Sequence, residues 1–147
     1  MDNKIYNFIN ESYFKQKRLP VFEHFIKPEL ISVDTGRVEV KMTVREEHLN
    51  LHRITHGGVL FALADLTMGL ACISHYKSIV TTDMNIQYIK NVNAGKTIKA
   101  IGIVENNGNS LMRTSCNIYD EDGRLLIRSS GSYFVLGELD MDAFNTK

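Results

Sequence analysis

One apolar stretch of the sequence combines two groups that could act on a carbonyl. It is HGGVLFALADLTMGLA, residues 56–71, which opens on His56-Gly57-Gly58 and carries a single carboxylate, Asp65. The apolar spacing predicts a helix that begins at the glycines. The first N–H groups of a helix have no partner inside it and carry a partial positive charge, so they can stabilise an oxyanion that forms on a carbonyl. The two glycines could equally just allow the helix to pack closely on a sheet.

Asp65 is the second candidate, because a carboxylate among apolar neighbours is expected to be buried. A buried carboxylate is normally hydrogen-bonded, ion-paired or functional, so Asp65 could be bonded to the backbone or an arginine, or act as a general base or nucleophile. Gly57 and Asp65 lie about 12 Å apart along a helix, too far to touch one carbonyl within a chain. Two antiparallel copies of the helix, related by a two-fold axis, would bring Asp65 of one near Gly57 of the other.

The elements that position these groups follow from the hydrophobic pattern. Residues 3–17 predict a short amphipathic helix, and the strict alternation of 37–44 predicts a half-buried strand that a turn at 34–36 joins to 29–33. After the central helix, strands are expected at 79–89, 97–105, 110–119 and 124–136, with turns at 91–95, 106–108 and 120–123. This order predicts an α+β fold in which a largely antiparallel sheet encloses one long helix.

Composition narrows the class of protein. The 147 residues are expected to form one domain, 1–147, whose first 27 residues are a helical extension. Seventeen basic and seventeen acidic side chains cancel, so no nucleic-acid or membrane partner is expected. The N-terminus lacks the apolar core of a signal peptide, and two cysteines suggest no disulfide framework. These features together predict a cytoplasmic protein.

A wider pattern surrounds the central stretch. It contains Asn50, His56-Gly57-Gly58, the Leu-Ala-Asp of residues 63–65, Gly69, and the segment TTDMNIQY at 81–88. This pattern resembles that of the PaaI-like acyl-CoA thioesterases of the hotdog-fold superfamily. The resemblance implies a hotdog fold, a long central helix wrapped by a curved antiparallel sheet, assembled as a homodimer or as a homotetramer built from two dimers. The active sites are then expected at the dimer interface.

The resemblance also implies an activity and roles for individual residues. The expected reaction is hydrolysis of an acyl-CoA thioester to the free acid and coenzyme A, with no cofactor beyond the coenzyme A of the substrate. The Gly57 amide would polarise the thioester carbonyl, and Asn50 and His56 would orient the substrate or the water. Asp65 of the other subunit would act as base or nucleophile, and Thr81 would help to hold the water. Tyr88, Lys90 and Asn91 are expected to line the coenzyme A channel.

Two positions depart from the pattern of these relatives. Many of them have Asn-x-x-Gly before the His-Gly-Gly, whereas this chain has Arg53 in place of the glycine. The turn at 106–108 also lacks the basic residue that many relatives place there. The conformation of the loop before the helix and the contacts to the nucleotide are therefore open.

Two other groups of residues could form a zinc site or a cysteine nucleophile. His48, His52 and His56 recur every four residues and could hold a catalytic zinc on a helix, but their segment shows no helix start, so no metal site is expected. Cys72 and His75 could form a nucleophilic dyad, although a buried structural cysteine is favoured. On the hotdog scaffold, a non-catalytic acyl-CoA-binding or sensing protein is the main alternative function, and a hydratase or dehydratase is a third.

Overall fold

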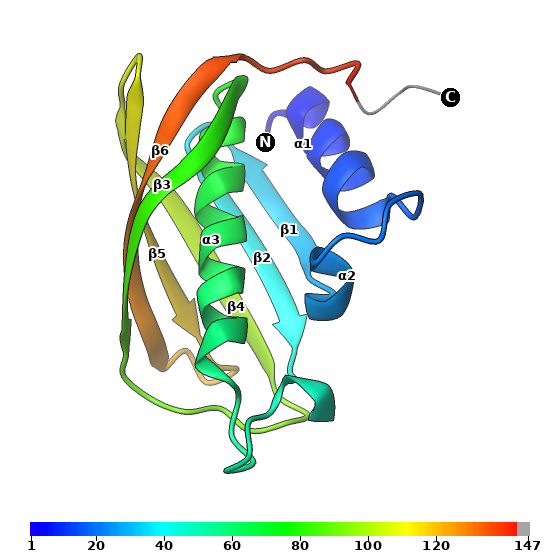
Figure 1. The fold of residues 1–147 in the computed structure, drawn as a ribbon, viewed down its shortest axis with the longest axis vertical. Coiled ribbons are helices and arrows are strands. Elements are labelled where there is room, and N and C mark those ends of the chain that lie inside the picture. The colour runs from blue at the N-terminus through cyan, green and yellow to red at the C-terminus, as the bar shows by residue number, and fades with distance from the viewer. Residues whose placement is uncertain (144–147) are drawn as a thin grey trace.

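A single long helix runs along the concave face of a curved sheet (Figure 1). The computed structural model describes residues 1–143. Its helical segments are α1 (Asn3–Ile9), the π-helical η1 (Asn10–Lys15), α2 (Glu23–Ile26), the 3-10 turn η2 (Glu46–His48) and α3 (Gly57–Ile73). Its strands are β1 (Glu29–Asp34), β2 (Arg37–Thr43), β3 (Lys77–Tyr88), β4 (Thr97–Asn107), β5 (Leu111–Tyr119) and β6 (Leu125–Glu138). The predicted order of elements is confirmed.

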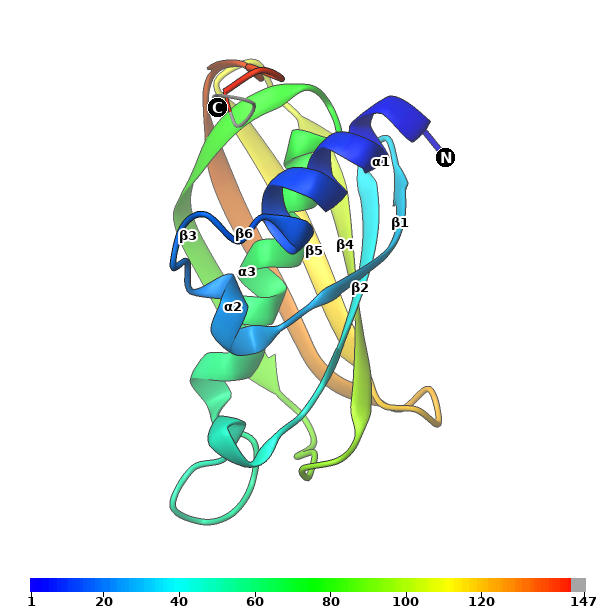
Figure 2. The ribbon, with the colours of Figure 1, turned by 90° about the vertical axis from the view of Figure 1, so that its right-hand side faces the viewer.

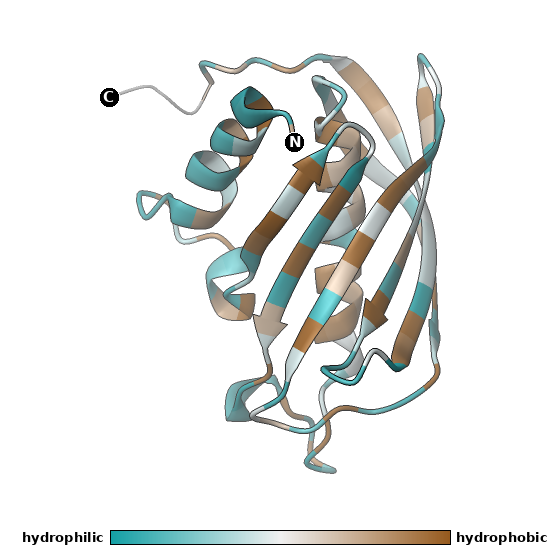
Figure 3. Ribbon diagram, turned by 180° about the vertical axis from the view of Figure 1, so that it is seen from behind, coloured by the Kyte–Doolittle hydropathy of each residue, from teal (hydrophilic) through white to brown (hydrophobic). Residues whose placement is uncertain are grey.

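The six strands form one antiparallel sheet in the order β1-β2-β4-β5-β6-β3. Alternation of side chains explains which face is covered: Val38, Val40 and Met42 of β2 are buried against the helix, while the residues between them face outward. Figure 3 shows the result as alternating apolar and polar bands along the strands. The strand β3 stands at one end of this order, so one of its edges is unpaired among residues 1–143.

Close packing of α3 on the sheet depends on Gly102 of β4. A Cβ atom at this position would lie 2.6 Å from the carbonyl oxygen of Thr67, in the middle of the helix. Glycine therefore lets the helix backbone approach the strand more closely than any other residue would. Gly131 of β6 permits a similar close approach, since a Cβ there would lie 3.2 Å from the carbonyl oxygen of Asp83. A glycine inside a strand is typical of such a close approach or of a bulge.

The N-terminal helices lie on the side of α3 that the sheet does not wrap (Figures 1 and 2). Asp2 caps α1 by accepting hydrogen bonds from the amides of Lys4 and Ile5. Ile5, Phe8 and Ile9 then pack into the core. The amphipathic helix expected in residues 3–17 is thus confirmed, with its second half wound as a π-helix.

The strands begin and end within two residues of the prediction, and one of these differences affects a predicted turn. The turn expected at 106–108 begins later, because Asn106 and Asn107 still pair with Arg113 and Met112 of β5 after a bulge that follows Val104. Asparagine at a strand end is typical of turns, but the backbone ladder continues irrespective of side-chain type. Within residues 1–143 the structure contains no helix that is both long and apolar enough to cross a membrane.

Candidate active site

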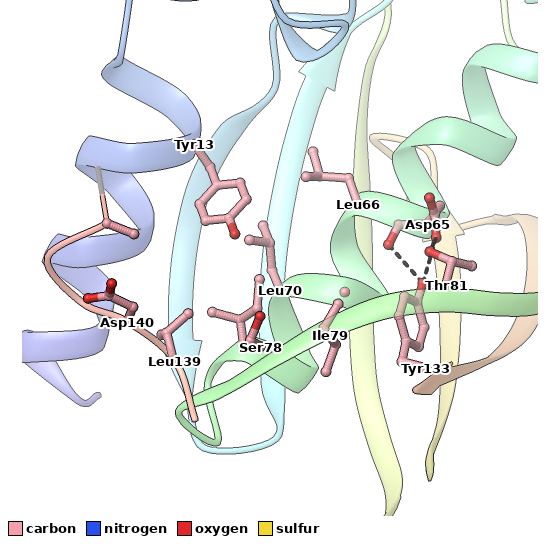
Figure 4. Close-up of a pocket in the computed structure, with 13 residues that line it drawn as sticks. Tyr13, Asp65, Leu66, Leu70, Ser78, Ile79, Thr81, Tyr133, Leu139 and Asp140 are labelled. Carbon is pink, nitrogen blue, oxygen red and sulfur yellow. Dashed lines mark hydrogen bonds between the residues drawn. The ribbon is translucent and has the colours of Figure 1, made fainter. Parts of the chain in front are cut away.

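Asp65 on α3 is held by two hydroxyl groups of its own chain (Figure 4). Thr81 Oγ1 and Tyr133 OH both donate to Asp65 Oδ1, at 2.9 and 2.8 Å. Thr81 of β3 and Tyr133 of β6 are direct partners across the β3–β6 ladder, so the sheet brings both hydroxyls under the same turn of the helix. Since both donors use Oδ1, the carboxylate is oriented through one oxygen, and Oδ2 makes no hydrogen bond to residues 1–143.

The expectation that Asp65 is buried is wrong for the single chain, in which the residue is half-buried. The reason is that α3 is apolar nearly all round but is not covered all round. One face has lower burial, and its members recur at helical spacing: Gly58, Phe61, Ala62, Asp65 and Leu66. We call these five residues the open stripe of α3. The carboxylate therefore reaches a solvent-accessible surface beside the edge strand β3.

Tyr133 is a site residue that the sequence prediction missed. Its side chain is 1% exposed, and burial, together with the charge of the Asp65 carboxylate, raises the pKa of the phenol well above its usual value. The hydroxyl consequently stays protonated and donates to Asp65. The alternation of β6 placed Tyr133 on the inner face, and a buried tyrosine hydroxyl needs a partner.

The start of α3 presents a second group of candidates. His56 is the N-cap residue, and its Nδ1 accepts a hydrogen bond from the Gly58 amide at 2.8 Å, so Nδ1 carries no proton. The Gly57 carbonyl accepts a hydrogen bond from Tyr88 OH at 2.8 Å. The Gly57 N–H makes no hydrogen bond to residues 1–143, as expected for the first residue of a helix. This amide is the predicted oxyanion donor.

Comparison with known proteins identifies the family. Residues 52–127, slightly more than half of the chain, match the sequence model described as "Thioesterase superfamily". The chain belongs to this superfamily. The human protein named acyl-coenzyme A thioesterase 13 is 34% identical to it over 103 residues, which are 68% of this chain and 74% of the human one.

Solved structures agree with this assignment. The PaaI protein of Escherichia coli, from the phenylacetic acid degradation operon, superposes with a TM-score of 0.84 at 26% identity, covering 92% of this chain and 96% of PaaI. A Streptococcus mutans protein solved with acetyl-CoA superposes with a TM-score of 0.78 at 26% identity, over 85% and 98% of the two chains. The PaaI-like hotdog fold is confirmed, and the protein is a thioester hydrolase.

In the loop before α3 of the thioesterase, Asn50 bonds the backbone and Arg53 has a left-handed conformation. Asn50 Oδ1 accepts hydrogen bonds from the amides of His52 and Ile54, at 2.9 and 3.4 Å. Between them, Arg53 adopts a left-handed conformation with φ of 63°, which a glycine would adopt without strain. Its guanidinium pairs with the Glu46 carboxylate. Asn50 thus shapes the loop, and the structure brings its amide to no other predicted site residue.

Replacing Arg53 tests whether this loop is strained. We expect Arg53→Gly to be more stable than Arg53→Ala by about 1 kcal/mol, because both lose the Glu46 ion pair but only glycine relieves the left-handed backbone. The measurement is the free energy of unfolding of the two variants in urea. Equal stabilities would contradict a strained conformation at this residue.

The residues predicted for the coenzyme A channel lie at the end of β3 and just after it. Tyr88 lies at the start of α3 through its bond to the Gly57 carbonyl, whereas Lys90 and Asn91 follow β3 with exposed side chains. The turn at 106–108 does receive a cation from elsewhere: Lys77 Nζ of β3 donates to Asn107 Oδ1 and to the Gly108 carbonyl, at 2.5 and 2.9 Å. The turn itself contains no basic residue, but the tertiary structure brings the Lys77 ammonium group to it.

The three histidines at 48, 52 and 56 do not share a helical face. His48 is fully buried: its Nδ1 accepts from the Arg45 amide at 3.0 Å, and its Nε2 lies 2.8 Å from the Phe25 carbonyl, to which it must donate. Both ring nitrogens thus serve the fold. Residues 1–143 contain no group of three or more side chains that could hold a metal ion.

Cys72 and Cys116 are buried thiols of the thioesterase core, and burial raises the pKa of each to about 12. The pKa of His75 is lowered, also by burial, and its Nδ1 lies 3.2 Å from Asn107 Nδ2. A dyad needs a thiolate or a base that can form one, so these environments do not support a Cys72–His75 nucleophile.

The thiols provide a direct test. We expect the native protein to react negligibly with dithionitrobenzoate at slightly alkaline pH, since both thiols are buried and protonated, and to react at both cysteines once unfolded in guanidinium. The measurement is absorbance of the released thiolate with and without denaturant. Rapid modification of one thiol in the native protein would show an accessible, activated cysteine.

Proposed function

We propose that this thioesterase hydrolyses acyl-CoA thioesters to the free acid and coenzyme A, in a site that two copies of the chain share. The observation that carries the proposal is the Asp65 carboxylate, held through Oδ1 alone by Thr81 and Tyr133. The name of the human relative and the acetyl-CoA in the S. mutans structure support acyl-CoA as the substrate class. No cofactor besides the coenzyme A of the substrate is needed.

The proposed chemistry uses the Gly57 amide at the start of α3 in one copy and the Asp65 carboxylate in the middle of α3 in the other copy. The thioester oxygen accepts a hydrogen bond from the Gly57 N–H, which stabilises the negative charge that develops there. Asp65 takes a proton from a water whose oxygen attacks the carbonyl carbon, and the carbon–sulfur bond breaks as the proton passes to the leaving thiolate. Alternatively, Asp65 itself attacks and forms an anhydride, which water then hydrolyses. His56 and Asn50 position the substrate or the water, and Tyr88, Lys90 and Asn91 contact coenzyme A.

The positions of the uncovered surfaces support a shared site. The open stripe of α3 includes Asp65 and borders the unpaired edge of β3. Antiparallel pairing of two β3 edges about an axis between Met84 and Asn85 would place Thr81 of one copy opposite Tyr88 of the other. Within each chain, Thr81 is hydrogen-bonded to Asp65 and Tyr88 to Gly57, so this pairing would also bring Asp65 of one copy close to Gly57 of the other. One symmetric contact thus joins each carboxylate to the amide of the other chain.

Hydrolysis of a panel of acyl-CoAs tests the proposed function. The purified protein is incubated with acyl-CoAs from acetyl to palmitoyl, and free thiol is followed against a no-protein control. We expect turnover of at least part of the panel. Saturable binding without thiol release would favour the acyl-CoA-binding alternative, and loss of the conjugated double bond of an enoyl-CoA would favour a hydratase.

Mixing two inactive variants tests the shared site. Asp65→Asn removes the base or nucleophile, and Gly57→Pro removes the amide donor. If the site is shared, random reassembly of equal amounts makes half of the dimers mixed, each with one intact site, and restores about a quarter of wild-type activity. If both groups act within one chain, the mixture stays inactive. Subunit exchange is verified by native mass spectrometry.

A labelling experiment separates base from nucleophile. In a single turnover in water labelled with heavy oxygen, an anhydride that water attacks at the Asp65 carbonyl carbon leaves the label in the Asp65 carboxylate, whereas a general-base pathway places it only in the acid product. Label in Asp65 therefore establishes the anhydride pathway. Peptide mass spectrometry of the segment that contains Asp65 reads out the difference.

A further inference from the structure

A cavity of about 330 Å³ extends from Asp65 toward the C-terminal end of α3. Asp65, Thr81 and Tyr133 stand at one end of it (Figure 4). Leu66, Leu70, Ile73 and Ile79 form apolar walls, and Leu139 lies near the far end. At that end the ring of Tyr13 projects from the N-terminal helical segment into the cavity, opposite Asp65 (Figure 4). The volume is within the range of small-molecule sites.

We propose that this cavity binds the acyl group of the substrate and that Tyr13 is its end wall, a specificity-determining residue that limits acyl length. The inference rests on the proposed hydrolysis of acyl-CoA. A thioester carbonyl beside Asp65 would have room for its acyl chain in this cavity, along the C-terminal half of α3. Burial of the chain against the leucine and isoleucine side chains then supplies the binding energy.

The dimensions indicate a medium-length acyl group. Asp65 and Ile73, which bound the cavity along the helix, are separated by eight residues, or about 12 Å of helix axis. An extended hydrocarbon with carbon–carbon bonds of ~1.5 Å covers that distance with about ten carbons. Acetyl groups would leave the apolar walls unfilled, and palmitoyl groups would collide with Tyr13.

The lining also predicts the charge that the acyl group carries. The described lining residues contain two carboxylates, Asp65 and Asp140, and no lysine, arginine or histidine. An acyl group with a terminal carboxylate, such as succinyl or glutaryl, would therefore meet like charge and no counter-ion. The structure favours uncharged, apolar acyl groups.

Tyr13 is held by the chain on either side of it. Ile5, Phe8 and Ile9 anchor α1 in the core, and Phe14 packs against the same core without lining the cavity. Phe14 thus offers a matched control: truncation of either aromatic side chain weakens packing of the same segment, but only truncation of Tyr13 lengthens the cavity. Ser78 of β3 lines the cavity from the other side and can be enlarged to shorten it.

The test is the dependence of kcat/KM on acyl length in wild type, Tyr13→Ala, Phe14→Ala and Ser78→Phe. We expect Tyr13→Ala to raise the ratio of long-chain to medium-chain kcat/KM about tenfold, because each further buried methylene adds about fourfold. Ser78→Phe should move the optimum to shorter chains, and Phe14→Ala should leave the profile unchanged. Succinyl-CoA should be hydrolysed poorly by all four proteins.

The outcomes separate this inference from the function on which it rests. If wild type hydrolyses no acyl-CoA, the proposed function fails. If wild type is active but both Tyr13→Ala and Ser78→Phe keep its length profile, the acyl group binds elsewhere and the inference fails. If Tyr13→Ala does not fold, the shift in Ser78→Phe decides alone, since that substitution lies on a half-buried strand position that tolerates an aromatic residue.

Discussion

Asp65→Asn is expected to lower kcat for acyl-CoA hydrolysis about 10²- to 10⁴-fold, the usual contribution of a positioned general base. The asparagine side chain has nearly the shape of aspartate and retains an oxygen that can accept from Thr81 and Tyr133, the two donors to Asp65 Oδ1. It cannot take a proton from water or attack as a carboxylate. The substitution therefore removes the chemistry and keeps the hydrogen bonds that orient the side chain.

Steady-state kinetics on the best acyl-CoA of the panel measures this effect. Asp122→Asn, in the exposed turn between β5 and β6, makes the same change of charge far from the site and should keep wild-type kcat. Thermal unfolding of both variants checks that the fold is intact. A kcat for Asp65→Asn within a few-fold of wild type would exclude Asp65 as base or nucleophile.

Gly57→Pro is expected to lower kcat about 10²- to 10³-fold, the range observed when one oxyanion donor is removed. Proline has no N–H, and position 57 is the first residue of α3, where proline is favoured because this N–H has no helical partner. The preceding His56 already has φ of −60° and ψ of 131°, a conformation compatible with a following proline. The backbone of the helix should thus be unchanged.

Gly57→Ala is the matched control for this prediction. Alanine adds a Cβ that would lie 3.2 Å from the Tyr88 ring, as proline also does, but it keeps the N–H. The exposed Tyr88 side chain can shift by a few tenths of an ångström to accommodate it. We expect Gly57→Ala to retain most of the activity. Equal losses in the two variants would mean that crowding of Tyr88, and not the amide, affects catalysis.

The sequence pattern was sufficient to predict the order of elements and much of the candidate site. Apolar and polar residues alternate in 37–44, and the residues after Gly57 are mostly apolar, because each of these patterns reflects which residues are buried. Burial selects the residue type position by position, so the type of element can be predicted from the spacing of apolar residues. Thr81 was predicted, from the resemblance to PaaI-like thioesterases, to bind the attacking water, and in the structure its hydroxyl donates to the Asp65 carboxylate. The helix start at Gly57 was likewise predicted from local rules.

Other features depend on which segments meet in space. The partial exposure of Asp65 follows from the curvature of the sheet, which leaves the open stripe of α3 uncovered while the N-terminal helices cover another side. Tyr133 comes to Asp65 because β6 pairs with β3, a contact between residues 52 positions apart in the chain (81 and 133). A hydrophobic pattern records whether a residue is buried but not against which partner.

The sequence by itself thus determined the helix, its glycine start and the carboxylate two turns into it. Only the tertiary structure decided that Oδ1 is occupied by two hydroxyls, and that a cavity leads from Asp65 to Tyr13 of the N-terminal segment. The physical reason is that local preferences act over a few neighbouring residues, whereas a pocket and its hydrogen bonds form between elements that long-range strand pairing and packing bring together.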